Sequence, residues 1–230
     1  MQNIRGFQPF SLIDYPGQVS AIIFLGGCNL RCQFCHNPEL VLTPGKGEAE
    51  AEENILSFLD QRKGKLDGVV ITGGEPCLTE ELVEFIQKIK EKGFLVKLDT
   101  NGTNPSLLEK CLKYVDYVAM DIKSSLDRYD EVCGVVVDKE KLKRSVELIK
   151  NFENYEFRTT VVRKFFSQKE LEEICNWLQG SKKYCLQQFV KKNPIINESL
   201  KSEIIYTKEE LNKFKEYAEK YFDKVEIRNV

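Results

Sequence analysis

The sequence predicts an α/β fold, a partial (β/α)6 barrel of parallel strands, because short apolar segments alternate strictly with amphipathic segments. Polar loops follow the first four strand-like segments, and no low-complexity tract or linker interrupts the order. Right-handed crossovers would join six such units into a parallel sheet that curls or closes. A flat doubly wound sheet is the structural alternative. The expected strands cover residues 18–25, 68–71, 94–98, 117–120, 155–162 and 184–189.

Each expected element rests on its residue pattern. Residues 18–25 contain a near-continuous apolar run, which is typical of a strand buried on both faces. Thr79 is expected to cap a helix that Gly93 ends. Further helices are expected at residues 54–59, 105–114 and 138–149, capping boxes pair Ser167 with Glu170 and Thr207 with Glu210, and a last strand covers residues 225–227.

The length of the chain favours one domain. Its 230 residues, of which 42% are hydrophobic, are enough for one core of ordinary size. We expect a lead-in at residues 1–17, the partial barrel at residues 18–190, and a C-terminal extension with a helix and a strand at residues 191–230. No role is predicted for residues 190–206.

The charge balance argues against nucleic-acid and membrane partners. Lys and Arg total 34 against 36 for Asp and Glu, so the net charge of -2 provides no global attraction to polyanions. The longest apolar run is far shorter than the roughly 20 residues of a membrane-spanning helix, and residues 1–10 lack a signal-peptide pattern. We therefore expect a cytoplasmic protein.

Three of the eight cysteines lie close together after the first expected strand. Cys28, Cys32 and Cys35 form a C-x3-C-x2-C run. A four-iron cluster normally takes four cysteines, so three thiolates would leave one iron open to an outside ligand. The alternative is a closed zinc site that adds His36, although Cys35 and His36 are adjacent and zinc ligands are usually spaced apart.

Polar residues follow the next three expected strands, which would place them on one rim of the barrel. In residues 72–76, paired glycines open the backbone to a ligand, and Glu75 can hold an ammonium group. Residues 99–101 follow the third strand, and Asp121 and Lys123 follow the fourth. The plainer interpretations are a turn, an Asx turn closed by a glycine, and a solvated loop.

The other five cysteines are scattered without ligand spacing, so burial as small hydrophobic residues is their default. One of them abuts the glycine loop and stands out for that reason. They are Cys77, which is the one beside the glycines, Cys111, Cys133, Cys175 and Cys185.

The three clustered cysteines together with Gly73-Gly74-Glu75-Pro76 resemble the radical S-adenosylmethionine superfamily. The stretches Ser11-Leu12-Ile13-Asp14-Tyr15-Pro16-Gly17 and Cys35-His36-Asn37-Pro38-Glu39-Leu40 narrow the resemblance. They are similar to activating enzymes of glycyl radical enzymes, and most similar to activating proteins of anaerobic ribonucleoside-triphosphate reductase. The resemblance covers roughly residues 5 to 165.

The resemblance implies the cofactors and their contacts. Cys28, Cys32 and Cys35 would bind one [4Fe-4S] cluster, whose fourth iron S-adenosylmethionine would chelate through its amino and carboxylate groups. A monovalent cation beside the cofactor is also implied. The implied contacts are Phe34 with adenine, Gly73, Gly74 and Glu75 with the amino group, Lys123 with the carboxylate, Asp99, Thr100 and Asn101 with the ribose region, Arg158 with the cofactor, and Asp99, Thr100 and Asp121 with the cation.

The implied reaction is reductive cleavage of S-adenosylmethionine, after which a 5'-deoxyadenosyl radical takes hydrogen from a glycine of a partner enzyme. Anaerobic ribonucleoside-triphosphate reductase is the expected partner, and flavodoxin or ferredoxin the expected electron donor. No residue need act as acid or base. The alternatives are another glycyl radical enzyme of the formate-lyase type, a small-molecule substrate, or a non-catalytic zinc or electron-transfer module.

Overall fold

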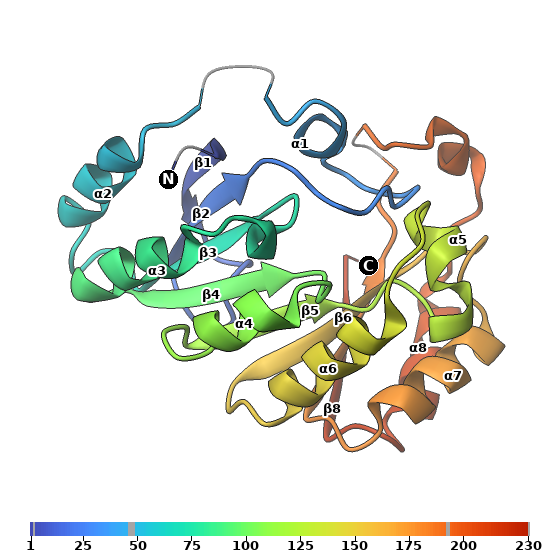
Figure 1. The fold of residues 1–230 in the computed structure, drawn as a ribbon. Helices are drawn as coiled ribbons and strands as arrows, with labels where there is room; N and C mark the ends of the chain where they lie inside the picture. The colour runs from blue at the N-terminus through green and yellow to red at the C-terminus, as the bar shows by residue number, and fades with distance from the viewer. Residues whose placement is uncertain (2, 46–48, 192–193, 230) are drawn as a thin grey trace.

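The computed structural model describes residues 1, 3–45, 49–191 and 194–229. Within them, eight strands form one sheet whose spatial order follows the chain (Figure 1). The strands are β1 (Ile4–Ser11), β2 (Ser20–Leu25), β3 (Gly68–Gly73), β4 (Leu95–Thr100), β5 (Tyr117–Asp121), β6 (Tyr155–Val161), β7 (Lys183–Gln188) and β8 (Lys224–Arg228).

The sheet is parallel from β2 to β8, and β1 joins it antiparallel to β2. Because β1 and β8 are its two edges, the sheet curves without closing. The predicted partial barrel is confirmed. A doubly wound sheet would reverse its strand order at a switch point, and this sheet does not.

The ends of the chain contribute more to the sheet than expected. Residues 1–17, expected as a lead-in, contain β1, which pairs Ile4 with Leu25 and Ser11 with Ser20. Gly6 and Pro9 hid this strand, because both residues are depleted in strands and are tolerated at an edge. The expected last strand is present as β8, and it extends the parallel sheet beside β7.

Helices α3, α4, α6 and α7 lie along the outer side of the curved sheet (Figure 1). Apolar residues of β3 and β4 that point outward, such as Val69 and Leu98, pack with residues of the helices in the main hydrophobic core. Among the described residues no helix has the length and apolar content to cross a membrane. The helices are α1 (Pro38–Leu42), α2 (Glu52–Asp60), α3 (Leu82–Glu91), α4 (Pro105–Cys111), α5 (Tyr129–Cys133), α6 (Lys139–Lys150), α7 (Gln168–Leu178) and α8 (Lys208–Ala218), with 3-10 turns η1 (Pro76–Leu78), η2 (Leu126–Arg128) and η3 (Glu198–Ser202).

Some of the predicted helix caps are confirmed and others are wrong. The capping box of Thr207 with Glu210 is confirmed, and Gly93 follows α3 with a φ of 90°. Thr79 was wrong as a helix cap, because η1 occupies the preceding residues and α3 begins only after Glu81. Ser167 caps α7, but the carboxylate of Glu170 accepts hydrogen bonds from Ser124 and Ser125 instead of completing a box.

The inner side of the sheet is filled at the amino ends of its strands. Tyr15 packs on Ile22 and Val70, and its ring centroid lies 6.0 Å from that of Tyr117. Beside them Glu156 is fully buried and accepts two hydrogen bonds from Arg228, at 2.8 and 2.6 Å. The inside of the barrel is therefore closed at this end, and space for a ligand remains at the carboxyl ends.

Candidate active site

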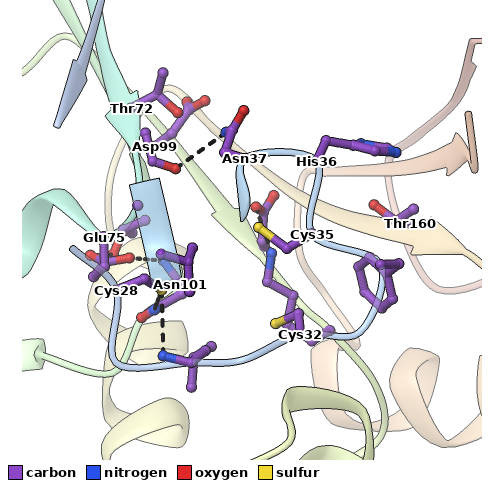
Figure 2. A pocket seen from close by; sticks show the side chains of 18 of the residues that line it. Cys28, Cys32, Cys35, His36, Asn37, Thr72, Glu75, Asp99, Asn101 and Thr160 are labelled. Atoms are coloured by element: carbon purple, nitrogen blue, oxygen red, sulfur yellow. Dashed lines mark hydrogen bonds and ion pairs between the residues drawn. The ribbon is translucent and has the colours of Figure 1, made fainter. Parts of the chain in front are cut away.

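A cavity of about 210 Å³ opens at the carboxyl ends of the strands, under the loop that joins β2 to α1. This loop, residues 26–37, is called the cysteine loop below, and its three cysteines face the cavity (Figure 2). Every residue predicted for the site lines the cavity except Arg158. The predicted lining residues are Cys28, Cys32, Phe34, Cys35, Gly73, Gly74, Glu75, Asp99, Thr100, Asn101, Asp121 and Lys123.

The glycine pair after β3 lets the cysteine loop approach closely. Gly74 N–H donates to the Leu25 carbonyl at 2.8 Å, and Glu75 N–H donates to the Gly27 carbonyl at 2.8 Å. A Cβ atom on Gly74 would overlap the carbonyl oxygen of Gly27. The two glycines thus serve the contact between two loops, a use that their sequence alone did not reveal.

Two further segments hold the cysteine loop. The carbonyl of Cys133, at the end of α5, accepts a hydrogen bond from Arg31 N–H at 2.8 Å. Asn197 donates to Gln33 twice, from its N–H to the carbonyl at 2.8 Å and from Nδ2 to Oε1 at 2.9 Å. Residues 194–206, for which the sequence predicted no role, therefore support the loop that carries the cysteines.

The three thiols fit the requirements of an iron-sulfur cluster. All are free, Cys32 is buried, and Cys28 and Cys35 are half-buried beside the cavity. Burial raises the pKa of Cys28 to about 11 and also raises the pKa of Cys35, whereas a hydrogen bond from Cys133 lowers the pKa of Cys32 to about 7. Soft thiolates on one side of a cavity are the ligand set that iron-sulfur clusters take.

The zinc alternative fits less well, because His36 is used elsewhere. Its Nε2 atom lies 2.9 Å from the Val190 carbonyl, and its ring stacks on Phe189 with centroids 5.7 Å apart. Among the described residues, no three Cys, His, Asp or Glu side chains converge as ligands of a single metal ion. The contacts of His36 favour a three-cysteine site over a closed site that includes it.

Glu75 joins the loop after β3 to the loop after β4. Its carboxylate accepts hydrogen bonds from Thr100 Oγ1 at 2.7 Å, from Asn101 N–H at 2.6 Å and from Cys77 N–H at 2.9 Å. The side chain is buried, and this burial raises its pKa against the effect of the three donors. The carboxylate thus fixes the rim, and its predicted contact with an amino group stays a prediction.

Charged side chains of β4, β5 and β6 pair with one another beside the cavity. Arg158 bridges the two carboxylates, with Nε 2.8 Å from Asp121 and Nη1 3.2 Å from Asp99. Lys123 lies 2.9 Å from Asp121, and the buried Lys97 pairs with Asp99. Although burial acts to raise it, the pKa of Asp121 is well below its usual range because of Arg158 and then Lys123. Three cations thus surround two carboxylates.

The sequence missed several lining residues. Thr72, Thr160 and Gln187 each lie two positions after an inward-facing residue of β3, β6 or β7, so period-two alternation could have identified them. Asn37 also lines the cavity and donates from Nδ2 to the Gly73 carbonyl at 3.5 Å. No local pattern predicts that contact, because it depends on how two loops pack.

Comparisons with known proteins agree with this geometry. Residues 22–178 match the family model of the Radical SAM superfamily. A protein of Methanocaldococcus jannaschii, provisionally named a glycyl-radical enzyme activating enzyme, is 37% identical over 99% of this chain and 96% of its own length. The pyruvate formate-lyase-activating enzyme of Clostridium pasteurianum is 35% identical over 54% of this chain and 53% of its own length.

Solved structures agree on the fold. Streptococcus suis SuiB bound to precursor peptide SuiA superposes with a TM-score of 0.70 at 14% identity, over 90% of this chain and 48% of SuiB. The chain thus spans about half the length of SuiB and of the Clostridium enzyme. Membership of the superfamily implies a [4Fe-4S] cluster and S-adenosylmethionine as cofactors. On the family match and the full-length similarity, the chain belongs to the radical SAM superfamily and, within it, to the glycyl-radical enzyme activating enzymes.

Proposed function

We propose that this chain cleaves S-adenosylmethionine reductively and generates a glycyl radical on a partner enzyme, with anaerobic ribonucleoside-triphosphate reductase as the first candidate. The observation that carries the proposal is a cavity lined by three free thiols together with the ammonium group of Lys123 and the carboxylates of Asp99 and Asp121. The full-length similarity to a protein named as an activating enzyme supports it.

In this proposal Cys28, Cys32 and Cys35 hold three irons of the cluster and leave the fourth to the amino and carboxylate groups of S-adenosylmethionine. The bound cluster would supply one electron that splits the sulfonium into methionine and a 5'-deoxyadenosyl radical. In the proposal the cysteine loop orients the cofactor, and the residues around the cavity exclude water. No residue of the chain needs to act as an acid or base.

Other lining residues would bind the rest of the cofactor. Lys123 lies at the cavity and its pKa is raised by Asp121, so it stays protonated and suits a carboxylate. Phe34 is buried in an apolar cluster with Phe165 and Phe189, which offers a flat surface to adenine. Gly73, Gly74 and Glu75 would serve the amino group, and Asp99 and Thr100 the ribose.

Arg158 would act through the two carboxylates and not by direct contact, because it pairs with both of them and does not line the cavity. The monovalent cation predicted at Asp99, Thr100 and Asp121 stays a prediction. Ammonium and guanidinium groups of the chain already neutralise these carboxylates, so such a cation would compete with them.

The partner's glycine would deliver one hydrogen atom to the 5'-deoxyadenosyl radical, which leaves 5'-deoxyadenosine and a glycyl radical. The partner would have to present this glycine at the cavity, where the strands end. A cytoplasmic location and flavodoxin or ferredoxin as reductant are part of the proposal. The formate-lyase type is the second candidate partner, which the similarity to the Clostridium enzyme favours.

The test is anaerobic reconstitution with iron and sulfide, followed by dithionite and S-adenosylmethionine. We expect four irons per chain and release of 5'-deoxyadenosine. Mixing with anaerobic ribonucleotide reductase, and separately with pyruvate formate-lyase, should give the glycyl doublet in electron paramagnetic resonance with the true partner. A loaded protein that never forms 5'-deoxyadenosine would refute the proposal, and a doublet with formate-lyase alone would reassign the partner.

A further inference from the structure

The side chain of Asn101 is turned toward the cysteine loop. This residue directly follows β4 and is only 5% exposed. Its Nδ2 atom lies 3.8 Å from Cys28 Sγ (Figure 2) and 3.1 Å from Asn29 Oδ1. A distance of 3.8 Å is within the range of a hydrogen bond to sulfur, because sulfur is larger than oxygen. Asn101 therefore donates to a predicted cluster ligand.

The orientation of the Asn101 amide is fixed by a partner that can only donate. Thr103 N–H lies 2.9 Å from Asn101 Oδ1, and a backbone N–H has no acceptor capacity. The oxygen must therefore face Thr103, which places the NH2 group against Cys28. An exchange of the amide oxygen and nitrogen would set two donors against each other.

Asn101, Asn29 and Thr103 form a closed ring of hydrogen bonds. Asn101 donates to Asn29, Asn29 Nδ2 donates to Thr103 Oγ1 at 2.9 Å, and Thr103 Oγ1 donates to Asn101 Oδ1 at 2.7 Å. With the Cys28 and Thr103 N–H bonds, both donors and both lone pairs of the Asn101 amide are engaged. The contact with the ribose region that the resemblance implied for Asn101 stays a prediction.

We propose that Asn101 is a positioning residue that donates a hydrogen bond to the Cys28 thiolate and so raises the reduction potential of the cluster. The inference rests on the proposed function, because it requires a cluster at Cys28. A donor at a ligand sulfur stabilises negative charge there, and the reduced cluster carries more of it. Removal of the donor should make the cluster harder to reduce.

The experiment compares Asn101→Ala and Asn101→Leu with Thr103→Val. The leucine variant keeps the number and branching of the side-chain heavy atoms and lacks the donor. The Thr103→Val control breaks the ring of hydrogen bonds but leaves the Asn101 amide beside Cys28. Each protein is reconstituted, its iron is counted, its fold is checked by circular dichroism, and its cluster is titrated with reductant under electron paramagnetic resonance.

We expect both Asn101 variants to shift the reduction equilibrium toward the oxidised cluster by roughly tenfold, which is 59 mV for a one-electron couple. The Thr103 control should stay close to the wild type. An Asn101→Leu potential equal to the wild type at full iron content would overturn the inference, and so would an equal shift in Thr103→Val. If the wild type itself took up no cluster, the proposed function would fail first and this inference with it.

Discussion

The two walls of the cavity are held by different forces. The cysteine loop has no regular secondary structure, and it is fixed by hydrogen bonds with the glycine turn, with the end of α5 and with Asn197. The other wall consists of strand ends, where Asp99 and Asp121 pair with Arg158. The first wall therefore depends on the close approach of backbone segments, and the second depends on pairing of opposite charges. Substitutions in the two walls should therefore fail in different ways.

The largest effect is expected at the thiols themselves. Cys32→Ala should abolish the cluster, because two thiolates cannot hold it in place of three. Iron and sulfide analysis with a visible spectrum after anaerobic reconstitution would measure this. Cys175→Ala is the matched control, since Cys175 is buried in the main core and distant from the cavity lining. Equal iron in both variants would remove Cys32 from the ligand set.

The charged wall should show the next effect, on stability. Arg158→Met leaves two carboxylates without their shared partner and should cost roughly 3 kcal/mol, measured by urea unfolding. Arg144→Met is the control, because Arg144 and Glu109 pair at the surface with about half of each side chain exposed. The control should cost less than about 1 kcal/mol. Similar losses in both variants would contradict the importance of the bridge.

We also expect the free energy of unfolding to depend on pH differently in the wild type and in Arg158→Met. The pKa of Asp121 is lowered in the folded state, so the unfolded chain binds more protons and stability rises with pH. The stabilisation is complete above the unfolded pKa of about 3.9 and is lost as pH falls toward the folded value. As the pH falls from about 5 to 3, the free energy of unfolding should therefore decrease more steeply in the wild type than in Arg158→Met. If the free energy of unfolding changed with pH in the same way in both proteins, the pairing of Asp121 with Arg158 would not be the cause.

A smaller loss is expected where the cysteine loop meets the glycine turn. Gly74→Ala places a Cβ atom on the Gly27 carbonyl, so the two loops must separate, at roughly 2 kcal/mol and with loss of iron binding. Gly45→Ala is the control, because nothing lies within 4 Å of a Cβ atom there. Normal iron content in Gly74→Ala would show that the loop adjusts without the close approach.

The smallest effect is expected at Asn197. Asn197→Ala removes the side-chain hydrogen bond to Gln33 and the cap that Asn197 Oδ1 gives to Ser199 N–H, but keeps the backbone bond, and should cost about 1 kcal/mol. Weaker binding of S-adenosylmethionine, measured by calorimetry on the reconstituted protein, should accompany it. Ser202→Ala in the same segment is the control, since Ser202 bonds only within that segment, to the Ser199 carbonyl. If both variants bound S-adenosylmethionine as tightly as the wild type, the contact of Asn197 with the cysteine loop would have no part in cofactor binding.

The order of strands and helices and the position of the cysteines could be predicted from the residue pattern alone. Period-two and helical spacing record which face of each element is buried, and parallel strands carry the residues after them to one rim. This is why Cys28, Asp99 and Lys123 could be assigned to one site before their contacts were known. Strand β1 was not predicted, because Gly6 and Pro9 are residues that strands usually lack. The strand becomes evident only from its pairing with β2.

The contacts among the site residues depend on the tertiary structure. The Glu75 carboxylate bonds to Thr100, and the Asn101 amide lies beside Cys28, contacts that no residue pattern predicted. Arg158 pairs with two carboxylates and does not line the cavity. The contact between Asn197 and Gln33 joins positions 164 residues apart. Hydrogen-bond partners depend on distances set by packing across the whole sheet, and a linear pattern of residue types carries no such distances.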